Sequence, residues 1–184
     1  MVQKHFRAFE ERLKEVTADS GYCSEKNLLF LKEHDIDSYI KLQDHEKRKT
    51  RAYKEDIGKY YNMTHQFFED EHYYVCHDGR ELRHINTEIR KQDGYTQTFE
   101  VYGCADCSGC EHKARCLYQY DPEKDADKNK IMKINEQWED LKASSHTNIE
   151  SEKGILNHQI RSIQTEGHFG DIKENENFRR FNHR

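Results

Sequence analysis

Apolar residues recur at intervals of three and four near the start of the chain, at Phe6, Phe9, Leu13 and Val16. An α-helix has about 3.6 residues per turn, so this spacing gathers the four side chains on one face. The pattern predicts an amphipathic helix over residues 5–16, with the charged residues between them facing water.

A strand, a helix and a second strand are predicted over the next segment. Residues 16–18 are interpreted as the end of a buried strand, and residues 19–22 as the turn that follows it. Ser24 is a favourable N-cap, which predicts a helix from there to about His34. Residues 37–42 alternate roughly as a strand does. A strand, a helix and a strand in this order indicate the beginning of an α/β sheet.

The middle of the chain changes from helical to β-like patterning. Residues 44–63 are basic and helical in pattern. Three β-like runs follow, over residues 72–76, 82–90 and 96–102. The segment His77-Asp78-Gly79-Arg80 fits a hairpin turn between the first two runs. This part of the chain therefore predicts an antiparallel β-rich subdomain.

Two helices are predicted toward the C-terminus. Residues 130–142 have apolar positions at helical spacing, and a polar loop is expected over residues 144–147. A last long helix is predicted to begin near Asn148 and to continue past Glu166.

Composition indicates a thin hydrophobic core. Hydrophobic residues make up 34% of the chain and charged residues 35%, and the mean hydropathy is −1.20. The 11 Tyr and 9 Phe residues argue against wholesale disorder. This balance favours a fragment whose partner surfaces are missing over an elongated α+β structure.

Charge and hydropathy limit the setting in which the chain acts. The net charge is −5, but the charges are well mixed, so local basic patches that contact nucleic-acid phosphates remain compatible with the sequence. No run approaches the ~20 apolar residues that span a bilayer, and the N-terminus lacks the apolar core of a signal peptide. We expect a cytoplasmic protein without membrane contact, whose cysteines are reduced.

The cysteines are concentrated in one region. Cys104, Cys107, Cys110 and Cys116 lie within thirteen residues, which in a reducing compartment indicates metal binding before disulfides. Cys107 and Cys110 form a pair with a two-residue gap, and Cys116 supplies a third thiolate. The preferred fourth ligand is Cys76, before the predicted hairpin turn. A site of four thiolates would hold a structural Zn²⁺ with no open position for water.

Three alternatives remain for these cysteines. Cys104 could replace Cys76, His112 is a weaker substitute, and the thiols could all be unliganded. Cys23 stands apart and is expected to be a small buried residue.

Several segments, taken together, resemble a known family. Residues 18–22 (Ala-Asp-Ser-Gly-Tyr) followed by residues 24–27 resemble the segment around the second catalytic aspartate of DDE transposases from bacterial insertion sequences. Residues 161–173 resemble the segment around the third acid, and residues 178–181 continue the similarity. Residues 74–79, with the cysteine cluster, resemble an insertion found in one large subfamily.

The resemblance implies a ribonuclease H-like fold and metal-dependent chemistry on DNA. In that family, two divalent ions, usually Mg²⁺, are held by an Asp, Asp, Glu triad and promote in-line attack on a phosphodiester. Asp19 and Glu166 would be the second and third acids, and both would bind Mg²⁺. Arg161 and Lys173 would contact DNA phosphate, and His158 would also belong to the DNA-binding residues.

Three departures from the family pattern are expected to matter. His158 stands where relatives often carry Tyr, which would weaken one DNA contact. The first aspartate is expected well upstream of Asp19, yet the eighteen residues before Asp19 contain no Asp. Relatives continue beyond Arg184 with another helix. The expectation is a transposase truncated at both ends and inactive alone; a nuclease that uses Glu10 or Glu11 as its first acid is a weaker alternative.

The predicted fold class is α/β, a partial ribonuclease H-like fold with an inserted β-rich, Cys-rich, zinc-binding subdomain. Residues 1–43 and 127–184 would form the core, and residues 44–126 the insertion. The predicted function is that of a transposase fragment whose intact ancestor cleaved and transferred DNA strands. The expected partners are the DNA ends of an insertion sequence and other transposase chains. When bound to DNA, the protein would be associated with the nucleoid. The alternative is a non-catalytic zinc-binding module that contacts DNA or protein.

Overall fold

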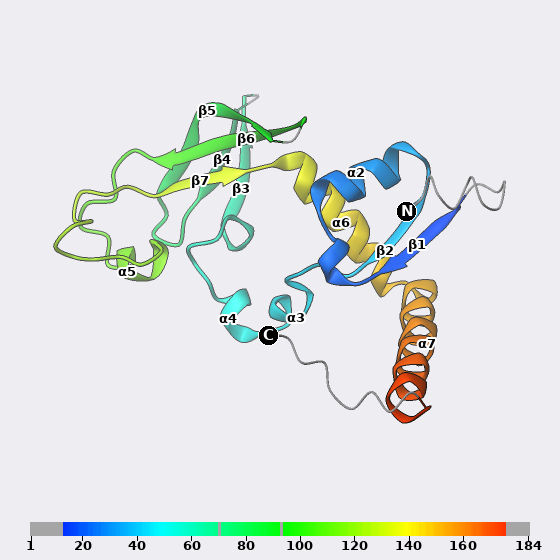
Figure 1. The fold of residues 1–184 in the computed structure, drawn as a ribbon. Helices are drawn as coiled ribbons and strands as arrows, with labels where there is room; N and C mark the ends of the chain where they lie inside the picture. Colours follow the sequence, from blue (N-terminus) through cyan, green and yellow to red (C-terminus); the bar gives the residue numbers. More distant parts are fainter. Residues whose placement is uncertain (1–12, 70, 93, 176–184) are drawn as a thin grey trace. The chain divides into compact units, whose positions relative to one another are not determined.

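The computed structural model describes residues 13–69, 71–92 and 94–175, with the backbone alone for residues 92 and 166–175. The chain forms two compact units, drawn in Figure 1. Unit 1 comprises residues 1–43 and 141–184, and unit 2 comprises residues 44–140. Helices and strands occur in both, so the chain is a mixed α/β protein.

Unit 1 contains a parallel pair of strands joined by a helix. Strand β1 (Glu15–Ala18) pairs with β2 (Asp37–Ile40) in parallel, and α2 (Glu25–Glu33) connects them. The Ser24 side chain accepts a hydrogen bond from the Asn27 backbone N–H at 3.3 Å and so caps α2. The predicted order of strand, helix and strand is confirmed.

The end of α6 (Glu136–Glu150) and helix α7 (Glu152–Asn175) pack in unit 1. The Ser145 hydroxyl is fully buried and donates to the Ile40 carbonyl at 2.7 Å, which ties α6 to β2. Helix α7 contacts both β1 and β2. The apolar core of this unit includes these buried side chains: Leu28, Leu31, Ile36, Ile40, Leu42, Leu141 and Ile149.

Unit 2 contains an antiparallel sheet of five strands in sequence order. The strands are β3 (Thr64–Phe68), β4 (Glu71–Val75), β5 (Glu81–Gln92), β6 (Tyr95–Cys104) and β7 (Ile131–Ile134). The turn between β4 and β5 has Gly79 at φ +75°, a backbone conformation that glycine adopts without strain. The predicted hairpin at this turn is confirmed.

The core of unit 2 lies at one end of the sheet. Leu82 is fully buried there together with Tyr102, Met132 and Ile134. The remaining elements of the unit are the short helices α3 (His45–Arg48), α4 (Arg51–Lys54) and α5 (Lys113–Cys116) and the 3₁₀ turn η2 (Tyr60–Asn62). Cys104 and Cys107 belong to the same buried cluster, so part of the cysteine region is core.

Two predicted helices are wrong in part. Residues 44–63 form separate short turns, because Thr50 ends one and caps the next: its hydroxyl donates to Lys47 O and accepts from Tyr53 N. Residues 131–134 form β7, since pairing with β6 overrides a spacing that also fits a helix. Helix α6 begins only after Asn135, whose side chain accepts from the Trp138 N–H at 2.9 Å.

Two further boundaries differ from the sequence prediction. The polar residues 144–147 lie inside α6, because Ser145 finds its partner in β2 and no loop is needed there. The helix predicted over residues 5–16, with Glu10 and Glu11, lies mostly outside the described residues, and its end at Glu15 and Val16 is part of β1. No helix in the described part of the chain is long and apolar enough to cross a membrane.

Candidate functional site

Asp19 lies at the C-terminal edge of the parallel strands in unit 1. It follows β1 directly, and its carbonyl accepts from the Tyr22 N–H at 3.0 Å in the turn η1 (Ser20–Tyr22). The strand register pairs Ala18 with Ile40, so the next residues, Asp19 and Lys41, leave the sheet side by side. The Asp19 side chain is 62% exposed and therefore accessible to a ligand.

Arg161 of α7 contacts Asp19 through both terminal nitrogens of its guanidinium group. Its Nη1 donates to Asp19 Oδ1 at 2.5 Å, and its Nη2 donates to Asp19 Oδ2. This bidentate geometry is the strongest that an arginine makes with a carboxylate. Sequence reasoning had assigned Arg161 to DNA phosphate; in this structure it neutralises the candidate catalytic acid.

His158 lies one helical turn before Arg161. Its Nε2 is buried and has no hydrogen-bond partner among the described residues. Burial lowers the pKa of His158, and the positive charges of Lys41 and Arg161 lower it further. The lowered pKa favours the neutral form of the ring. The sequence analysis does not identify Lys41 as a neighbour of Asp19. Its place directly after the second predicted parallel strand was a signal for this position.

Glu166 and Lys173 belong to the backbone of α7, but their side chains lie outside the described part of the structure. Glu166 follows Arg161 by five residues on the same helix. The expected meeting of Asp19 with Glu166 therefore stays a prediction.

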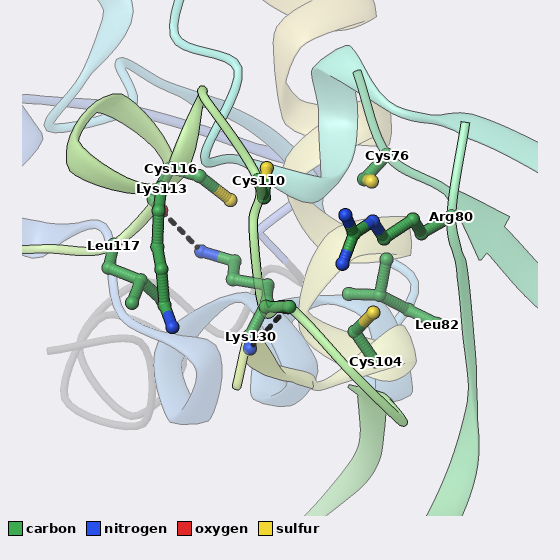
Figure 2. A pocket seen from close by; sticks show the side chains of 10 residues that line it. Cys76, Arg80, Leu82, Cys104, Cys110, Lys113, Cys116, Leu117 and Lys130 are labelled. Carbon is green, nitrogen blue, oxygen red and sulfur yellow. Dashed lines mark hydrogen bonds between the residues drawn. The ribbon is translucent and has the colours of Figure 1, made fainter. Parts of the chain in front are cut away.

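Unit 2 holds a second candidate site, in which five cysteines surround one small cavity of about 20 Å³ (Figure 2). The cysteines are Cys76, Cys104, Cys107, Cys110 and Cys116. A space of this size accommodates a single ion or water molecule. Cys76 comes from the hairpin after β4, so the fold brings it to a cluster that begins 28 residues later in the sequence.

The thiols influence one another across this cavity. Burial raises the pKa of the Cys116 thiol; the charge of Lys130 opposes this rise, and the nearby Cys76, Cys107 and Cys110 add to it. Burial also raises the pKa of Cys104 to about 11, and its hydrogen bond with Cys107 adds to this effect. Such shifts oppose thiolate formation in the absence of a cation; a bound metal ion reverses them.

Three basic side chains also border the cavity (Figure 2). Arg80 is held by Asp78 at 2.7 Å and by the Asp106 carbonyl at 2.8 Å. The Lys130 ammonium donates to the Cys116 carbonyl at 2.9 Å, and burial lowers its pKa. Lys113 is the third. An all-thiol donor set suits a soft cation such as Zn²⁺. Within the described residues, however, no group of three or more His, Cys, Asp or Glu side chains is already arranged to hold a metal ion.

Comparison with known proteins supplies the family. Residues 75–184, more than half of the chain, match the family model described as a transposase DDE domain.

The chain belongs to the DDE transposase family.

The match covers the five clustered cysteines and Glu166, whereas Asp19 lies before it. Membership implies action on DNA with divalent metal ions such as Mg²⁺. No curated protein matches the chain. No solved structure matches it either.

Proposed function

We propose that unit 1 is part of a ribonuclease H-like catalytic core in which Asp19 and Glu166 are the second and third acids of the triad. The observation that carries this proposal is the Arg161–Asp19 pair. It joins residues 142 positions apart, one from each of the two segments whose sequences resemble the transposase active site. The motif helix thereby lies against the strand end that carries the candidate acid.

The residue types of this proposed site suit a divalent cation. Asp19 offers an exposed carboxylate at a strand end, and hard cations such as Mg²⁺ prefer carboxylate oxygens. When bound, the ions activate the attacking hydroxyl and stabilise the leaving oxygen of the phosphodiester. Asp19 would hold the ion just after the end of β1, and Glu166 would complete its coordination from α7. Arg161 and Lys173 would bind phosphate and orient the DNA, and His158, whose Nε2 is buried, would support them from the same helix. The DNA bound would be the ends of an insertion sequence.

We further propose that these 184 residues do not cleave DNA alone. The resemblance supplies only two of three acids within them, and one of these two is paired with Arg161. Strand cleavage would then require an acid contributed from outside these residues, for example by another transposase chain.

The cysteine cavity of unit 2 is proposed to hold a structural Zn²⁺ through Cys76, Cys107, Cys110 and Cys116. The support for this set is that all four side chains line the same cavity, which Cys76 reaches from the end of β4. Cys104 remains the alternative ligand, but its thiol already donates to the Asp106 carbonyl at 3.2 Å. The basic side chains at the cavity would offset the double negative charge of four thiolates around Zn²⁺.

A second candidate function is a non-catalytic zinc-binding module that contacts DNA or protein. The cysteine cavity favours it, because this cavity lies wholly within unit 2 and does not involve Asp19 or Glu166.

Binding of Mn²⁺, a spectroscopic substitute for Mg²⁺, tests the catalytic assignment without requiring cleavage. We would titrate Mn²⁺ into the wild-type chain and into Asp19→Asn and Glu166→Gln, and follow free Mn²⁺ by electron paramagnetic resonance. Glu33→Gln is the matched control, since Glu33 is an exposed acid on α2 of the same unit. The proposal expects both site variants to lose Mn²⁺ binding and the control to keep it. Equal binding by all four proteins would favour the non-catalytic module.

A further inference from the structure

Lys41 occupies the position next to Asp19 at the carboxyl edge of the two parallel strands. Both residues immediately follow the last register pair, Ala18 with Ile40. In open α/β sheets, ligands bind beyond the carboxyl ends of parallel strands, because loops and helix ends leave a crevice there. Lys41 is therefore placed where a substrate of this unit would lie.

The charge of Lys41 is not used within the described part of the structure. No ion pair or hydrogen bond engages its ammonium among those residues, whereas the charge of Arg161 is paired with that of Asp19. Lys41 is nevertheless close to the site, because its charge affects the imidazole of His158. The Asp19–Arg161 pair is neutral in sum, so among the described side chains Lys41 adds a positive charge to this edge, in a chain whose net charge is −5.

We infer that Lys41 is a phosphate-binding residue of the Asp19 site and contacts the DNA backbone beside the candidate catalytic carboxylate. The inference rests on the proposed function, since it takes DNA as the anionic ligand. A divalent ion on Asp19 would release Arg161, and the guanidinium would then join the Lys41 ammonium on the same stretch of phosphates. Lys41 thus supplies the contact that exists before metal binding, and Arg161 the contact that metal binding adds.

DNA binding by single-lysine variants tests this assignment. We would measure the affinity for a fluorescein-labelled 30-base-pair duplex by fluorescence anisotropy over a series of salt concentrations, without metal. The variants are Lys41→Gln, Lys41→Arg and the control Lys32→Gln. Lys32 is an exposed lysine in the last turn of α2, the turn that leads into the amino end of β2. Circular dichroism melting confirms that each variant is folded.

Loss of one phosphate contact has a defined signature. Lys41→Gln is expected to weaken binding about three- to tenfold and to reduce the slope of log affinity against log salt by about 1. Lys41→Arg should restore both, because it keeps the charge, and Lys32→Gln should behave as the wild type. With Mg²⁺ present, Arg161→Gln should cause an additional loss that is absent without metal.

Two results would overturn the inference while leaving the proposed function intact. In one, Lys41→Gln binds DNA with the affinity and salt slope of the wild type. In the other, Lys32→Gln loses as much affinity as Lys41→Gln, so that only general surface charge matters. A wild-type chain that binds no duplex at all would instead contradict DNA binding itself, and the inference would be overturned together with the proposed function.

Discussion

Arg161 on α7 and Asp19 after β1 form a bidentate ion pair between two segments separated by 142 residues. Arg161 is 32% exposed, so its guanidinium lies between the helix and water. The candidate metal-binding carboxylate is thus already neutralised by a side chain from the helix that contains Glu166, the proposed third acid. A cation that binds Asp19 has to compete with this guanidinium.

Removing this competitor should strengthen metal binding. Exposed ion pairs contribute about 0.2–1 kcal/mol, so Arg161→Gln should raise Mn²⁺ affinity by up to about fivefold. Arg161→Lys keeps the charge but not the bidentate geometry, so its Mn²⁺ affinity should lie between those of the wild type and Arg161→Gln. Electron paramagnetic resonance of free Mn²⁺ provides the measurement. Weaker Mn²⁺ binding by Arg161→Gln would show that Arg161 positions the carboxylate for the ion instead of competing with it.

Zinc content should distinguish the two candidate fourth ligands. Cys76→Ser and Cys116→Ser are expected to reduce bound zinc well below one per chain and to lower the melting temperature, because a structural site needs all four thiolates. Cys104→Ser should retain zinc. Mass spectrometry of the purified proteins measures the metal, and Cys23→Ala, a buried cysteine of unit 1, is the control. If Cys76→Ser retained zinc and Cys104→Ser lost it, Cys104 would be the fourth ligand in place of Cys76.

The hydrogen bond between α6 and β2 should be important for the stability of unit 1. Ser145→Ala removes the hydroxyl that donates to the buried Ile40 carbonyl, which should cost about 1–3 kcal/mol of unfolding free energy. Urea denaturation measures the change. Thr147→Ala is the matched control, because Thr147 is exposed on the same helix and bonds only locally, to Ala143 O. An equal loss in both variants would mean that helix propensity, not the contact with β2, sets the effect.

Close packing at the start of α7 should make Gly154 intolerant of a side chain. A Cβ there would lie 2.1 Å from Asn148 O and 2.7 Å from Ile149 O, both backbone atoms that cannot rotate away. Gly154→Ala should therefore destabilise the protein by about 2 kcal/mol or more. Gly21→Ala is the control, since no atom lies within 4 Å of its added Cβ. The melting temperature of the variant is the measurement. A Gly154→Ala protein that melts at the same temperature as the wild type would contradict the close approach of α7 to α6.

The acid sensitivity of unit 1 should depend partly on His158. Its pKa in the folded chain is lowered from the ordinary value of 6.5, first by burial and then by Lys41 and Arg161. The unfolded state therefore takes up a proton more readily than the folded state. The stability that comes from keeping His158 neutral is fully present above the pKa of His158 in the unfolded chain. It is lost as the pH falls through the lower pKa of the folded chain. Urea midpoints measured between pH 8 and pH 5 should fall more steeply for the wild type than for His158→Gln; parallel curves would contradict this.

Local sequence was sufficient for several features. The Ser24 cap, the hairpin at Gly79 and the strands β4, β5 and β6 follow from cap, turn and alternation signals that act over a few residues. The transposase family was also evident from the sequence, because its motifs are short and specific, and the family model confirms it.

Tertiary structure decided what depends on contacts between distant residues. Ile131 and Ile134 fit a helix by spacing, but a hydrogen-bonding edge on β6 made their segment a strand. The partner of Arg161 and the position of Lys41 beside Asp19 depend on strand register and on the packing of α7, which bring together residues far apart in the chain. Periodicity reports which face of an element is apolar, but not which element meets that face; packing free energy in the folded chain determines the partner.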